Sequence, residues 1–157
     1  MIKNLIALCV IAFLCSCGND GMGEFDNINT ADAIKGMFNK QAEQTKKEGM
    51  ISKLKYDAHA LEGFWILDGN LIEDDSLKSI YTNWDKHNKI VDYKLESVQV
   101  FPINTTNAAY HYQTEIVYID SAKTERTLKQ LESGVVTKVA EKWLYLNGNT
   151  SNITSKL

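Results

Sequence analysis

The chain has 157 residues, 24% of them charged, and a formal net charge of −3, which fits one domain large enough to bury a core. Its mild acidity and the lack of a long basic run argue against nucleic-acid binding and against an electrostatic membrane contact. All three cysteines, Cys9, Cys15 and Cys17, lie near the N-terminus, so we expect no disulfide, thiol nucleophile or cysteine metal site in the domain.

The N-terminal residues resemble a bacterial lipoprotein signal. Lys3 precedes an apolar run from Leu5 to Cys15, which is shorter than the about 20 residues of a membrane-spanning helix and fits the apolar part of a secretory signal. LCSC, residues 14–17, then resembles a lipobox, whose last cysteine receives a diacylglyceryl group before the signal is cut just ahead of it. An ordinary signal peptide cut nearby and an uncleaved N-terminal anchor are the alternatives.

The lipobox resemblance implies that residues 1–16 are a signal peptide and that Cys17 becomes the lipidated first residue of the mature chain. Its acyl chains would anchor the protein to a membrane of the bacterial cell envelope, with the domain outside the cytoplasm. Gly18 follows the cysteine instead of Asp, which in enterobacterial lipoproteins permits transfer to the outer membrane. Residues 17–30, rich in glycine and small polar residues, predict a flexible tether, and residues 31–157 a single domain.

Helical spacing begins after the predicted tether. Asn29 or Thr30 is predicted to cap a long helix, and the pattern weakens at Gly49 before it resumes, which predicts one long helix or two joined near Gly49. The apolar positions are Ile34, Met37, Phe38, Ala42, Ile51, Leu54, Ala58 and Leu61.

A hairpin and a second helix are predicted next. In FWILDGNLIE the pair Asp68–Gly69 stands between short apolar runs and indicates a tight turn, with arms over 64–67 and 71–72. Asp74 or Asp75 is predicted to cap a helix with an apolar stripe of Leu77, Ile80, Tyr81 and Trp84.

From Ile90 the pattern changes to that of β-strands, with strands over 91–101, 108–120 and 127–146. Gly134 predicts a bulge or bend in the third strand. Turns are expected at 102–107, at 120–123 and at Asn147-Gly148-Asn149, the last before a short strand over 151–156. Helices followed by a meander of long antiparallel strands indicate an α+β fold.

This order resembles the nuclear transport factor 2-like superfamily, which includes SnoaL-like, polyketide-cyclase-like and ketosteroid-isomerase-like domains. The resemblance covers about 31–156 and is carried by FWILDGNLIEDDSLKSIYTNW, VFPINTTNAAYHYQTEIVYI and SGVVTKVAEKWLYLNGN. It implies a cone, in which N-terminal helices pack on a strongly curved antiparallel sheet around a pocket at the open end.

The chain departs from this family after the "nG" turn. Many members continue with Trp and a His–Ser pair, whereas residues 149–155 contain neither Trp nor His. Ketosteroid isomerases of this fold use an Asp base and an oxyanion hole of Tyr and protonated Asp. No acid or tyrosine here matches those residues one by one, so we assign no catalytic residue and consider the chain more consistent with a non-enzyme.

The histidines predict neither a metal site nor a cofactor. His59, His87 and His111 are scattered and show no metal-ligand spacing. His111 shares a strand face with Gln113 and Glu115, which could line a polar cavity or form the wet side of the sheet.

Aromatic residues are the candidate ligand contacts. Several fall on elements that would surround the cone, where rings can either fill the core or line a pocket for a small organic molecule. Our candidates for the pocket are Trp65, Tyr81, Trp84 and Tyr112.

Three functions are compatible with these features. We favour a lipid-anchored, non-catalytic module of the cell envelope that binds a small apolar or amphipathic molecule. The first alternative is an isomerase- or cyclase-type enzyme acting on a small apolar carbonyl compound. The second is an interaction module that uses the exposed sheet face, for example to form a homodimer.

Overall fold

The described chain begins with helical segments, continues with a short hairpin and another helix, and ends in four long strands, as the α+β prediction requires. The computed structural model describes residues 26–58, 61 and 63–153; the predicted signal peptide and Cys17 lie outside the described residues. Within those ranges, no helix has both the length and the apolar character needed to cross a membrane. The elements are α2 (Asn27–Glu48), the 3-10 helix η1 (Met50–Tyr56), β1 (Phe64–Leu67), β2 (Asn70–Ile72), α3 (Asp74–His87), β3 (Lys89–Pro102), β4 (Asn107–Ile119), β5 (Glu125–Val139) and β6 (Lys142–Asn152).

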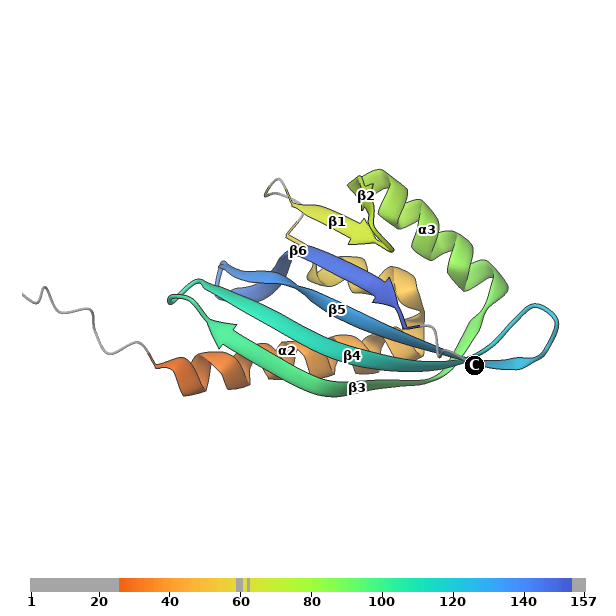
Figure 1. The fold of residues 1–157 in the computed structure, drawn as a ribbon, viewed down its shortest axis with the longest axis horizontal. Coiled ribbons are helices and arrows are strands. Elements are labelled where there is room, and N and C mark those ends of the chain that lie inside the picture. The colour runs from red at the N-terminus through yellow and green to blue at the C-terminus, as the bar shows by residue number, and fades with distance from the viewer. Residues whose placement is uncertain (1–25, 59–60, 62, 154–157) are drawn as a thin grey trace, which may run out of the picture.

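The six strands form a single sheet in the order β2-β1-β6-β5-β4-β3. All neighbours are antiparallel except β1 and β6, which are parallel. Register shifts interrupt β3 at two places and the β5–β6 pair between Val135 and Val136, next to Gly134, where a bend was predicted. Such bulges increase local bending and twist, so the sheet curves around α2, which runs along one of its faces (Figure 1).

Alternation along β4 separates the two faces of the sheet. Tyr110, Tyr112, Thr114 and Ile116 are buried, and the residues between them are only partly so. Phe38 of α2 packs on the buried face, with its ring centroid 5.1 Å from those of Tyr110 and Tyr112. The core therefore lies between α2 and this inner face, and His111 lies on the opposite, outer face with its strand-mates Gln113 and Glu115.

The helices begin earlier in the chain than their sequence signals suggested. Asp26, not Asn29 or Thr30, caps α2, and its Oδ1 accepts a hydrogen bond of 2.9 Å from the Asn29 backbone N–H. The folded part thus starts inside the segment predicted as a tether. Glu73, not an aspartate, occupies the cap position of α3. At Gly49, with φ of 91°, α2 ends and η1 follows, which confirms the alternative of two segments joined there.

The turn predicted at Asn147-Gly148-Asn149 is wrong. These residues lie inside β6, and the chain reverses instead at Ala140 and Glu141, whose φ angles are 46° and 65°. Gly148 lets the ring of Trp65 pack closely against the backbone, because a Cβ at this position would lie 2.2 Å from Cζ3 of Trp65. The predicted hairpin around Asp68–Gly69 is confirmed.

Candidate functional site

A cavity of about 360 Å³ opens between α3, the start of η1 and one end of the sheet. Strands β1, β4, β5 and β6 all contribute to its wall, so segments far apart in the chain meet there. The apolar part of the wall consists of Met50, Leu67, Ile80, Tyr81, Trp84, Tyr118 and Leu128, and the polar part of Lys53, Asp68, Gln130, Thr150 and Asn152.

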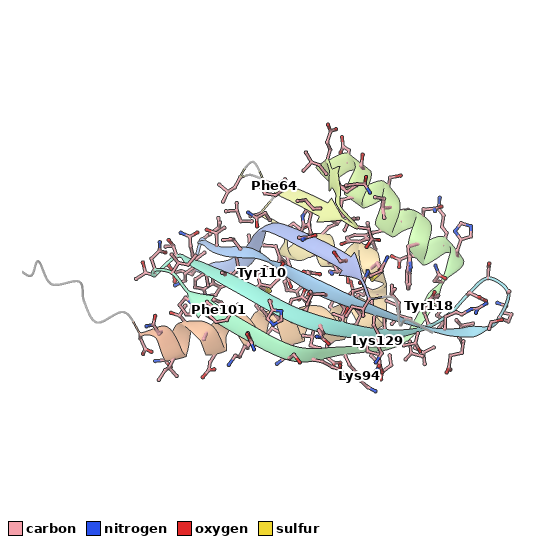
Figure 2. The ribbon with its side chains drawn as sticks, viewed as in Figure 1. Phe64, Lys94, Phe101, Tyr110, Tyr118 and Lys129 are labelled. Atoms are coloured by element: carbon pink, nitrogen blue, oxygen red, sulfur yellow. The ribbon has the colours of Figure 1, made fainter. Side chains whose placement is uncertain are left out.

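Helix α3 supplies the aromatic wall. Its apolar residues recur at helical spacing, so one stripe faces inward. Tyr81 is buried, and Trp84 is half-buried with its ring centroid 5.2 Å from that of Tyr118 on β4. Figure 2 labels Tyr118. A flat apolar molecule could therefore contact ring faces contributed by a helix and by the sheet.

Asp85 joins α3 to η1, the second helical wall. Its Oδ1 accepts a hydrogen bond of 2.7 Å from the Met50 backbone N–H, and its Oδ2 one of 2.9 Å from that of Ile51. These N–H groups belong to the first turn of η1, where no earlier carbonyl of the helix can accept them. The positive φ of Gly49 brings the chain close to the carboxylate, and a Cβ at this position would lie 2.7 Å from it.

A buried ion pair lies at the inner end of the cavity. Lys53 Nζ is 2.9 Å from Glu132 Oε2, and the two side chains are 3% and 1% exposed. Glu132 also accepts hydrogen bonds from Tyr112 at 2.5 Å, from Tyr110 at 3.2 Å and from Thr150 at 3.5 Å. Lys53 and these three hydroxyls place four donors around the two oxygens, so the acceptor positions of the carboxylate are occupied.

The pair continues into a network of tyrosine hydroxyls. The hydroxyl oxygens of Tyr112 and Tyr145 are 3.0 Å apart, and Tyr145 donates to Gln41 Oε1 of α2 at 2.9 Å. Burial raises the pKa of Tyr110, Tyr112 and Tyr145 well above the usual value, and the negative Glu132 raises each pKa further. These side chains therefore stay protonated and act as donors.

Lys53 is held as an ammonium. Burial is the largest single influence and would lower its pKa, but the Glu132 carboxylate together with the surrounding tyrosines outweighs burial and leaves the pKa well above the usual value. A protonated amine has no lone pair for attack on a carbonyl, so Schiff-base chemistry at Lys53 is disfavoured. The buried Tyr93 hydroxyl interacts electrostatically with the Lys53 ammonium. Among the described residues it has no hydrogen-bond partner with good geometry.

Of the four predicted pocket residues, Tyr81 and Trp84 lie in the cavity wall. Trp65 and Tyr112 do not: Trp65 packs in the core with its ring centroid 5.8 Å from that of Tyr145, and Tyr112 is fully buried beside Glu132. Contact of any of the four with a ligand stays a prediction.

Sequence reasoning missed Lys53 and Glu132. They are 79 positions apart, and charged side chains are placed at the surface by default. One available signal was the alternation of β5, which puts Glu132 on the same face as Leu128 and Val136.

The histidines do not approach the cavity where the structure describes them. His111 faces outward, and His87 is exposed at the end of α3. His59 lies outside the described residues. Within those residues, no three His, Cys, Asp or Glu side chains gather in a way that could hold a metal ion.

Solved structures resemble this one in fold but not in sequence. An NTF2-like protein of unknown function from Prochlorococcus marinus has a TM-score of 0.64 at 12% identity, covering 80% of this chain and 94% of its own. An NTF-2 like protein of unknown function from Shewanella oneidensis has a TM-score of 0.60 at 13% identity, covering 78% and 98%. A ketosteroid isomerase-like protein from Erwinia carotovora has a TM-score of 0.58 at 18% identity, covering 86% and 100%.

No protein-family model and no curated protein sequence matches the chain. The structural matches establish the fold alone. The chain adopts the nuclear transport factor 2-like α+β cone, as its sequence pattern predicted. Function must therefore be argued from the side chains of the cavity.

Proposed function

We propose that this protein is a non-catalytic small-molecule-binding module, held in the bacterial cell envelope by a lipid on Cys17. The observation that carries the binding proposal is the 360 Å³ cavity, which has aromatic walls and a buried charged group at its inner end. Pockets for small organic ligands combine these two features, since apolar walls provide affinity and a few polar groups fix orientation. The anchoring proposal is supported by the lipobox-like LCSC at residues 14–17.

The polar groups around the cavity favour binding over isomerase chemistry. An isomerase needs a base that can reach a substrate proton. Among the described residues, Asp68 supplies the one carboxylate of the cavity wall, and its two oxygens accept hydrogen bonds from the backbone and side-chain N–H groups of Asn152 at 2.8 and 2.7 Å. Glu132 lies behind the wall, with its oxygens occupied by Lys53, Thr150 and two tyrosines.

The enzyme alternative draws support from this same Glu132. A carboxylate buried within hydrogen-bond reach of Tyr110 and Tyr112 is an arrangement that a proton-transferring enzyme could use. It would require substrate to displace Lys53 or Thr150 from the carboxylate. A small apolar carbonyl compound that exchanges its α-protons faster with the protein than with a Glu132→Gln variant would support the enzyme and contradict our proposal.

Native mass spectrometry of the full-length protein, purified from its host in detergent, tests binding and anchoring together. We expect a bound small molecule on the wild type, and its loss from Trp84→Ala, which removes the largest ring of the wall. Phe64→Ala, on the outer face of β1, is the matched control and should retain the molecule. The intact mass should show a chain beginning at Cys17 with added acyl groups.

Two results would contradict these proposals separately. Wild-type protein with no bound molecule, even when purified without heating or extensive washing, would count against binding. An unmodified Cys17, or an intact residue 1–16 segment, would count against lipid anchoring while leaving the cavity argument untouched.

A second function rests on the outer sheet face. Strand register places Phe64, Asn147, Val135, Ala109 and Phe101 in one row across five strands, and we call these five residues the outer row. Phe64 and Phe101 at its two ends are 46% and 55% exposed (Figure 2). Exposed apolar groups arranged over a sheet are typical of interaction surfaces. As the alternative function, we propose that the protein forms a homodimer through this face.

A further inference from the structure

We propose that the ligand of the cavity is uncharged and presents a hydrogen-bond acceptor oxygen to Lys53 and Tyr81. This inference rests on the binding function proposed above and names the chemical class of the ligand. It follows from the donors left over at the inner end of the cavity, from the balance of charge around it, and from the aromatic shape of its walls.

Donors outnumber acceptors at the inner end of the cavity. The ammonium of Lys53 carries three N–H groups; among the described residues Glu132 accepts one of them at 2.9 Å, and the Tyr93 hydroxyl interacts with the same ammonium, which leaves one N–H group over. Tyr81 belongs to the same wall, and its hydroxyl makes no hydrogen bond to another described residue. A ligand that accepts hydrogen bonds satisfies these groups, whereas a ligand that only donates meets an occupied carboxylate.

The charges exclude a carboxylate ligand. Glu132, 2.9 Å away, already neutralises the positive charge of Lys53. Asp68 adds a negative charge to the wall. A ligand carboxylate would give up its hydration and meet no net positive charge in return. A neutral carbonyl or ether oxygen has little hydration to lose and still gains a charge-assisted hydrogen bond from Lys53.

The aromatic walls of the cavity favour a ligand whose remaining part is planar. Trp84 and Tyr118 present adjacent rings, and Leu67 and Leu128 complete the apolar part of the wall near them. A fused aromatic or other planar ring system of modest size therefore fits a volume of about 360 Å³ better than an extended acyl chain does.

Three probes with the same naphthalene ring isolate the oxygen and the charge: 2-acetylnaphthalene, which is neutral with an acceptor oxygen; 2-naphthoate, which is anionic; and 2-ethylnaphthalene, which has no oxygen. Isothermal titration of the full-length protein in detergent, with empty micelles as the blank, measures their affinities. We expect the ketone to bind on the order of tenfold more tightly than either of the other two, the effect of one good hydrogen bond to a charged donor.

Paired variants assign this preference to the buried pair. Lys53→Met combined with Glu132→Gln removes both charges at nearly constant volume, and we expect it to reduce the preference for the ketone severalfold, to the part that Tyr81 supplies, while 2-ethylnaphthalene binds as before. The matched control is Lys129→Met with Glu115→Gln, a pair of the same composition with an N–O distance of 2.8 Å on the outer face, which should leave all three affinities unchanged.

Tyr81→Phe covers the case in which the double variant fails to fold, because it removes one hydroxyl that no described residue binds. It should weaken the ketone severalfold and leave 2-ethylnaphthalene unchanged. Tighter binding of 2-naphthoate, or equal binding of ketone and hydrocarbon, would overturn this inference while the binding function stands. If none of the probes binds and no molecule copurifies, the proposed function fails as well.

Discussion

Lys53 and Glu132 bring opposite charges into an interior otherwise built largely from aromatic rings. The transfer of each ion out of water is strongly unfavourable, and the pair is tolerable because the attraction between the ions and the hydrogen bonds from Tyr110, Tyr112 and Thr150 offset this cost. Apolar side chains of similar volume could be equally stable in this place. The pair is therefore better explained as a device that keeps a charged donor beside the cavity than as a source of stability.

Removal of one member of the pair should be far worse than removal of both. Lys53→Met leaves the Glu132 carboxylate buried without a counter-ion, and we expect the free energy of unfolding to fall by about 3–5 kcal/mol. Lys53→Met with Glu132→Gln should lie within about 2 kcal/mol of the wild type, since no buried charge is left uncompensated. Urea unfolding followed by circular dichroism measures both, and equal losses for the two variants would contradict the explanation given above.

The tyrosine network predicts a loss of stability at alkaline pH. Burial raises the pKa of Tyr110, Tyr112 and Tyr145 above the ordinary 10.0, so between pH 10 and 11 the unfolded chain releases protons that the folded chain keeps. The free energy of unfolding should then fall by up to about 1.4 kcal/mol per pH unit for each such group. The raised pKa of Lys53 acts in the same direction, because its contribution is complete below 10.5 and is lost as pH rises through the folded-state value.

Urea unfolding between pH 9 and 11 measures this slope directly. Tyr112→Phe should make the slope shallower by about one proton's contribution, because one titrating hydroxyl is gone. A free energy of unfolding that stays constant over this pH range would show that the hydroxyls ionise equally easily in the folded chain.

At the scale of elements, the pocket depends on how α3 is held to η1. The two hydrogen bonds from the backbone N–H groups of Met50 and Ile51 to the Asp85 carboxylate are charge-assisted, and they connect the helix that carries Trp84 with the one that carries Lys53. Loss of this link would let the aromatic wall move relative to the charged end of the cavity.

We expect Asp85→Ala to lower the free energy of unfolding by about 2–3 kcal/mol and to weaken ligand binding as well. Asp85→Asn keeps one acceptor oxygen and should lose less. Lys78→Ala, on the exposed side of α3, is the control and should change neither quantity. Urea unfolding and titration with 2-acetylnaphthalene provide the two readings; an Asp85→Ala protein of normal stability would show that other contacts hold the helices together.

Elements with strong local patterns could be predicted from the sequence, and elements fixed by distant contacts could not. The Asp68–Gly69 hairpin and the long alternating strands carry their signals within a few residues. The reversal at Ala140 and Glu141 has no such signal, because neither residue favours a positive φ, and the pairing of β5 with β6 imposes it. Gly148 led to the wrong prediction of a turn. A glycine is needed at this position to make room for the ring of Trp65, which lies more than 80 positions earlier in the chain.

The residues of the candidate site also fall into those that local patterns predicted and those that distant contacts bring together. Tyr81 and Trp84 were within reach of sequence reasoning because the helical stripe of α3 and the expected cone place them near a pocket. The ion pair was not, because Lys53 of η1 and Glu132 of β5 meet only in the folded chain. Polar groups that give a pocket its selectivity are often assembled this way, from segments that carry no common motif.

At the scale of the whole molecule, the two faces of the sheet support separate roles. The inner face holds the tyrosine network and one end of the cavity, whereas the outer row lies on the opposite face. Because the cavity and the outer row lie on different faces, a partner bound on the outer row would leave the cavity accessible. A two-fold arrangement would bring Phe64 and Phe101 of one copy against the same row of a second copy, since an isologous interface uses one patch twice.

This arrangement predicts a dimer that a single charge can disrupt. Phe101→Asp places a carboxylate in the outer row and should convert the full-length protein in detergent from dimer to monomer, because an apolar interface cannot solvate it. Ile28→Asp, at an apolar position on α2 that is 75% exposed and outside the outer row, is the control and should remain dimeric. Light scattering after size-exclusion chromatography, corrected for bound detergent, measures the mass. A monomeric wild type would reject the interface, whereas a monomeric Phe101→Asp that still binds 2-acetylnaphthalene would show that the two faces work independently.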